Sequence, residues 1–150
     1  TLLSDAVRSS IGEEVTPDRG NLREELTELL VALSDYFRSP LGWAALRVCI
    51  DSAGVRSGRA PGLDSITDRV LDEHIQLVDR ILERAEIRGE LSLNAEIGSA
   101  VRSAIYGAVV MHMLGHRHVQ SDSGPGELEL WASSTCDLLL DGLGLVLSSA

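Results

Sequence analysis

Apolar residues recur every three or four positions along most of the 150-residue chain, and the alternation that is typical of strands is weak throughout. The period predicts six helices, at about residues 2–12, 16–38, 41–53, 64–88, 94–117 and 125–147. We therefore predict an all-α fold, a six-helix orthogonal or antiparallel bundle with one core and no second domain.

Turn-forming residues mark the ends of these helices. Thr16-Pro17 has the form of a cap followed by proline at the first helical position, and Asn21 has capping-box spacing to a glutamate, so the second helix begins at one of these two sites. Ser39-Pro40 ends that helix and caps the next one, because a residue before proline is pushed out of the α region. Gly89 fits the left-handed position that closes the fourth helix.

The segment from Gly98 to Gly115 is apolar on nearly every side of its helix. We expect such a helix to be buried on more than one side, and the last helix also has a broad apolar side. The two C-terminal helices thus carry more apolar surface than a monomer of this size needs. This favours a homodimer whose interface is a four-helix bundle, with a monomer in which these helices are simply central as the alternative.

Composition narrows the function. The formal net charge is −10, with 23 acidic and 13 basic residues, which excludes nucleic-acid binding by these residues. No run of 18 apolar residues is present, so we predict no membrane span. Cys49 and Cys136 suit a reducing cytoplasm, as small buried apolar residues rather than a disulfide framework. Every basic residue is Arg, which predicts a GC-rich bacterial source.

Four segments, in the same order along the chain, resemble TetR-type transcriptional regulators. They are Thr16-Pro17-Asp18-Arg19-Gly20-Asn21-Leu22-Arg23-Glu24-Glu25-Leu26, Ser39-Pro40-Leu41-Gly42, Leu82-Glu83-Arg84-Ala85 through Arg88-Gly89-Glu90-Leu91, and Asp137-Leu138-Leu139-Leu140-Asp141-Gly142-Leu143. They are similar to the opening of the ligand-domain helices, the next helix junction, the end of the long helix and the last helix of those proteins. The glycine-rich region 54–63 departs from the usual pattern, and we expect it to reshape the mouth of the pocket.

The resemblance implies the C-terminal regulatory domain of such a protein, which binds an effector and dimerises through its last two helices. It also implies a helix-turn-helix domain on the N-terminal side, which this chain lacks. The chain starts at Thr1 rather than Met, so we expect that basic domain upstream, and the helix at 2–12 as the connection to it. On this interpretation, DNA is bound only through the absent domain, the partner is a second copy of the chain, and the resemblance implies repression.

We expect the effector to be a small apolar or amphipathic molecule, held by polar or aromatic residues on otherwise apolar helix faces. The candidate ligand-binding residues are Tyr36, Phe37, Trp43, Arg47, His74, Val78 and Tyr106. The candidate dimer-interface residues are Ala104, Ala108, Met111, Trp131, Thr135, Leu138 and Leu139. Ordinary packing is the alternative for each of the candidate ligand-binding residues.

The histidines do not form a convincing metal or catalytic site. His112 and His116 are four residues apart and His118 follows, but the Glu-x-x-His and His-Glu-x-x-His patterns are absent, and a solvated helix end explains them better. We therefore predict no enzyme activity, no metal and no cofactor. Two other hypotheses stay open, a helical dimer without a DNA-binding head that binds a partner protein, and a small metal-binding helical bundle.

Overall fold

The computed structural model describes residues 18–54, 63–116 and 126–148 of the chain. These residues form five helices and no strand, which confirms the all-α prediction. The helices are α2 (Leu22–Arg38), α3 (Pro40–Gly54), α4 (Leu63–Ile87), α5 (Ala95–His116) and α6 (Glu127–Ser148). The predicted helix at 2–12 lies outside the described residues, as do the side chains of His74, Cys49 and His116.

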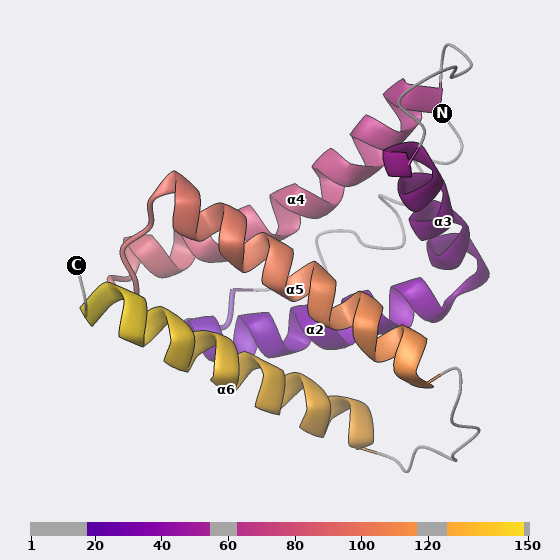
Figure 1. The fold of residues 1–150 in the computed structure, drawn as a ribbon. Helices are drawn as coiled ribbons and strands as arrows, with labels where there is room; N and C mark the ends of the chain where they lie inside the picture. The colour runs from indigo at the N-terminus through magenta and orange to yellow at the C-terminus, as the bar shows by residue number, and fades with distance from the viewer. Residues whose placement is uncertain (1–17, 55–62, 117–125, 149–150) are drawn as a thin grey trace.

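The central element of the described bundle is α2, which contacts each of the other four helices (Figure 1). Its leucines recur at three- and four-residue steps, so they form a broad apolar face that the neighbouring helices cover. Four of them have no exposed surface, Leu26, Leu29, Leu30 and Leu33. The last two helices, α5 and α6, run antiparallel and are in contact (Figure 1).

Asn21 is the residue that starts α2. Its Oδ1 accepts a hydrogen bond from the Glu24 N–H at 2.8 Å, so the capping-box position is the true helix start and Thr16-Pro17 precedes it. Ser39 acts at the other end as predicted. Its N–H donates to the carbonyl of Tyr36 at 3.0 Å and closes α2, while its Oγ accepts the Gly42 N–H at 3.0 Å at the start of α3.

Two glycines with positive φ set the ends of later helices. Gly89 has φ 75° and follows the end of α4, as the sequence predicts. The predicted start of the last helix at Pro125 is wrong by two residues. Gly126 has φ 93°, which is incompatible with a right-handed helix, so α6 begins at Glu127.

The single described chain covers one side of the fifth helix completely, so burial on more than one side stays a prediction. Its buried apolar side chains form one stripe at four-residue steps, Val101, Ile105, Val109 and Met113. The opposite side carries Met111 and Leu114, which are 67% and 42% exposed, because no described helix covers it. The apolar surface predicted to be in excess is therefore present, but it lies outside the core of the single chain.

Candidate functional site

The candidate ligand-binding residues lie on α2 and on three helices that contact it, α3, α4 and α5. Tyr36 and Phe37 are buried at the end of α2, with ring centroids 5.2 Å apart, and Val78 on α4 is fully buried. Trp43 on α3 and Tyr106 on α5 are partly buried and pack against the same apolar cluster. The structure thus places these five residues on one core. Arg47 is exposed on α3, and the side chain of His74 is outside the described residues.

Tyr106 is a candidate whose phenol lies near charged groups. Burial, and to a smaller degree the negative charge of Asp79, raise the pKa of its phenol well above the ordinary value. Asp79 on α4 pairs with Arg102 on α5 at 2.5 Å, so an ion pair joins the two helices near this hydroxyl. A neutral phenol beside a charge pair is the kind of placed polar group that orients an amphipathic molecule.

The candidate dimer-interface residues have different degrees of exposure. Leu138 on α6 is 75% exposed and Met111 on α5 is 67% exposed, and Leu130 on α6, which the sequence analysis missed, is 71% exposed. The other candidates are exposed (Ala104) or half-buried (Ala108, Trp131, Thr135 and Leu139). On α6 the exposed leucines lie opposite Ala132 and Cys136, which face the core.

Trp131 packs on a histidine of its own chain. The ring of His112 on α5 stacks on the indole with centroids 3.9 Å apart and an interplanar angle of 18°. The interpretation of His112 as part of a solvated helix end is therefore wrong, since its ring stacks on a side chain of the neighbouring helix. Trp131 contributes to the contact between α5 and α6.

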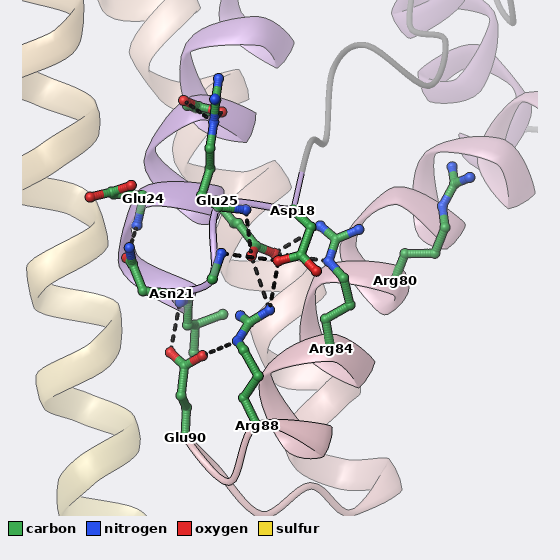
Figure 2. A network of polar contacts seen from close by, with 12 residues as sticks. Asp18, Asn21, Glu24, Glu25, Arg80, Arg84, Arg88 and Glu90 are labelled. Atoms are coloured by element: carbon green, nitrogen blue, oxygen red, sulfur yellow. Dashed lines mark hydrogen bonds and ion pairs between the residues drawn. The ribbon is translucent and has the colours of Figure 1, made fainter.

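A network of charged side chains around Glu25 is the most extensive polar feature of the described chain (Figure 2). The Glu25 side chain has no exposed surface, although it is a carboxylate. Its Oε2 accepts hydrogen bonds from Nε and Nη2 of Arg84, at 3.1 and 2.7 Å, and its Oε1 lies 3.1 Å from Nη1 of Arg88. The Arg19 backbone N–H also donates to Oε1, at 3.2 Å. Every oxygen of this buried group is therefore satisfied, as burial of a charge requires.

Arg88 extends the network to Glu90 and Asp18 (Figure 2). Its Nε donates to Glu90 Oε1, and its Nη1 lies 3.2 Å from Asp18 Oδ1. Glu90 Oε2 accepts the Leu22 N–H at 2.7 Å. Burial raises the pKa of Glu90, but the Leu22 N–H and the Arg88 guanidinium outweigh this effect and hold the pKa below its ordinary value.

This network was not predicted from the sequence, although a signal for it is present. Glu25 is three residues after Leu22 and four before Leu29, so it lies on the apolar side of α2. Arg84 and Arg88 are four residues apart and share one side of α4. A carboxylate on an apolar face together with two arginines on one face of another helix indicates a buried ion pair. The structure brings together two of the segments on which the resemblance rests.

A second polar contact joins α2 to α6. The Arg23 guanidinium donates to both carboxylate oxygens of Asp137, at 2.7 and 3.0 Å, and to Ser133 Oγ at 2.7 Å. The hydrogen bond from Arg23 holds the pKa of Asp137 below its ordinary value. Beside this pair the Cys136 thiol is buried and lies 3.5 Å from the carbonyl of Arg23, and burial raises its pKa. Cys136 is thus a packing residue, as predicted.

Two findings concern the classes of protein considered from the sequence. The described residues include no group of three His, Cys, Asp or Glu side chains suited to hold a metal ion, and the side chains of His116 and His118 are outside them. Within the same residues, Ala95–Gly115 of α5 is long and apolar enough to cross a membrane. This is weak evidence for a span, because a core or interface helix meets the same criterion.

Comparison with known proteins agrees with the resemblance. The family described as Tetracyclin repressor-like, C-terminal domain, matches residues 16–124, which include α2 to α5 and leave α6 outside the match. No curated protein and no solved structure gives a match. Because the family match covers well over half of the chain, the protein belongs to the tetracyclin repressor-like C-terminal domain family.

Proposed function

We propose that this chain is the effector-binding and dimerisation domain of a TetR-like transcription regulator, most simply a repressor. Family membership supports a regulatory domain of this kind rather than an enzyme. On this proposal the chain binds DNA only through a helix-turn-helix domain on its N-terminal side, and it works in the cytoplasm of a bacterium. A basic helix-turn-helix segment encoded in frame upstream of Thr1 would support this organisation, and a start codon close to Thr1 would contradict it.

The observation that carries dimerisation is the apolar surface of the last two helices. Met111 and Leu114 on α5 and Leu130 and Leu138 on α6 are all exposed, on the sides of their helices that face away from the core. Large apolar side chains exposed on two neighbouring helices support an interaction site, and self-association of two helices from each subunit would cover them in a twofold-symmetric way. A stable interface of this kind buries about 800 Å² on each partner.

Sedimentation equilibrium of the wild type and of Leu138→Asp tests the dimer. Burial of one leucine contributes about 1.5 to 3 kcal/mol, and twofold symmetry places the change in both subunits, so we expect the dissociation constant to rise at least about a hundredfold. The matched control is Ile50→Asp, which introduces the same charge at a side chain that is 55% exposed on α3. Dimerisation unaffected by Leu138→Asp, or equally weakened by Ile50→Asp, would contradict the proposed interface.

The ligand site is proposed at the core shared by α2, α3, α4 and α5, which includes Tyr36, Phe37 and Val78 and against which Trp43 and Tyr106 pack, with His74 on α4 kept as a candidate from the sequence. We propose that an apolar or amphipathic effector displaces part of this packing and shifts the population between two arrangements of the domain. Thermal-shift screening with amphipathic small molecules identifies a ligand.

The same ligand is then measured against two variants. Tyr106→Ala and His74→Ala should each weaken binding of the ligand, while both variants still dimerise as the wild type does. An unchanged thermal shift in both variants would show that the ligand binds elsewhere.

A further inference from the structure

The residues that lead into α2 are held by two carboxylates through their backbone. The Arg19 N–H donates to Glu25 Oε1 at 3.2 Å, and the Leu22 N–H donates to Glu90 Oε2 at 2.7 Å. Glu90 lies just beyond the end of α4, 68 residues from Leu22 in the sequence. Backbone bonds of this type fix the path of the chain itself and not only one side chain.

Arg88 joins the same two carboxylates into one unit. Its guanidinium contacts Glu25 and Asp18 through Nη1 and Glu90 through Nε, so a single planar group bridges three acids (Figure 2). Only an arginine has several donors in a fixed plane suited to such bridging. Since Glu25 is fully buried, separating residues 18–22 from this unit would remove the Arg19 N–H from a buried carboxylate and Asp18 from the Arg88 guanidinium.

The turn after α4 determines where Glu90 lies. The Gly89 N–H donates to the Glu86 carbonyl and the Glu90 N–H to the Ala85 carbonyl, both at 2.9 Å, with Gly89 at φ 75°. This closing turn depends on a residue that adopts a left-handed conformation without strain. The position of the Glu90 carboxylate is therefore set by the geometry of one glycine.

We propose that Glu25, Arg88 and Glu90 form a joint that makes the segment entering α2 move together with the C-terminal turn of α4. These are positioning residues, because they act on the backbone of residues 18–22. The functional consequence rests on the function proposed above. An effector that displaces this end of α4 transmits the displacement through the joint to the part of the protein that precedes Asp18.

Amide hydrogen exchange measured by NMR on the whole chain tests the joint without effector, DNA or dimer formation. Gly89→Ala distorts the turn, and we expect it to speed exchange of the Leu22 amide about tenfold or more, because a charge-assisted hydrogen bond is weakened. The matched control is Gly126→Ala, the same change at a glycine with φ 93° before α6. It should leave the Leu22 amide unchanged relative to the amide of the core residue Val109.

A double variant separates coupling from general destabilisation. In a Glu90→Gln background the Leu22 amide already exchanges faster, so we expect Gly89→Ala to add less than about a twofold further change. If the accelerations of Leu22 amide exchange by the two single substitutions multiply in the double variant, the effects are independent and the proposed joint is refuted. Equal acceleration at Leu22 and Val109, which reports only global unfolding, would also refute it.

A second comparison keeps the proposal testable if Gly89→Ala does not fold. Glu90→Gln is compared with Glu86→Gln, whose carboxylate accepts the Leu93 N–H at 3.0 Å from the same turn of the chain. We expect only Glu90→Gln to accelerate Leu22, and an equal effect of both variants would refute the proposal. None of these results depends on the oligomeric state, so failure of the joint is distinguishable from failure of the proposed function.

Discussion

Replacing Glu25 by Gln is the most informative single change in the core. The substitution preserves the size of the side chain but removes its charge and one of its two acceptor oxygens. Arg84 and Arg88, whose side chains are 24% and 21% exposed, then keep their charges without the buried carboxylate that binds them. The amide NH₂ of the new residue also faces cations, so no rearrangement of the amide satisfies both arginines.

The magnitude follows from the burial. Removing one partner of a buried ion pair costs about 3 to 5 kcal/mol, against a total stability of about 5 to 15 kcal/mol for a domain. At about 2 to 4 °C per kcal/mol for a chain of this size, we expect the melting temperature to fall by about 10 °C. The control is Glu28→Gln on the same helix. Glu28 pairs with Arg19 at 3.0 Å, but the two side chains are 41% and 49% exposed, so the loss is at most about 1 kcal/mol.

Thermal and urea denaturation followed by circular dichroism provide the measurement, at a fixed protein concentration because dimerisation would contribute to stability. We expect Glu25→Gln to lower the midpoint much more than Glu28→Gln. A loss below about 1 kcal/mol for Glu25→Gln, or equal losses for both variants, would show that the buried carboxylate does not have the proposed energetic importance.

Two further predictions concern packing and pH. A Cβ at Gly42 would lie 2.0 Å from the carbonyl oxygen of Tyr36, so Gly42→Ala should lower the free energy of unfolding by about 1 to 3 kcal/mol. The control Gly98→Ala should be close to neutral, because its Cβ would meet only the Arg102 side chain at 3.6 Å. Equal unfolding free energies for the two variants would contradict the close approach of α2 and α3. The lowered pKa of Glu90 gives stability that is present above its ordinary pKa of 4.5 and is lost as the pH falls through the lower folded value. Below about pH 4.5, the denaturation midpoint should therefore decline less steeply with falling pH in Glu90→Gln than in the wild type. Parallel pH profiles of the two proteins would refute this.

The sequence predicts local structure well because the signals are local. Asn21, Ser39 and Gly89 act within one turn of their own helix, and each lies where its capping chemistry requires. The alternative between two starts of α2 needed the structure, since both sites have valid capping chemistry. The start of α6 was misplaced because the sequence signal of Pro125 competes with a conformation of Gly126 that only the structure shows.

Contacts between distant segments were predicted less completely. Apolar residues on nearly every side of α5 predict broad burial, but they do not say which side a neighbouring helix covers. No role was predicted for Glu25, because its partners Arg84 and Arg88 are 59 and 63 positions away. Family resemblance supplied the class of protein, and the proposed ligand and dimer residues remain predictions.

The central position of α2 also affects how the chain is made. Its first turn is bound to α6 by the pair of Arg23 and Asp137, which are 114 positions apart. During synthesis from the N-terminus, the leucine-rich side of α2 leaves the ribosome long before the helix that covers part of it. This part of the core therefore closes only after α6 has been translated, and until then the nascent chain exposes apolar surface that is later buried.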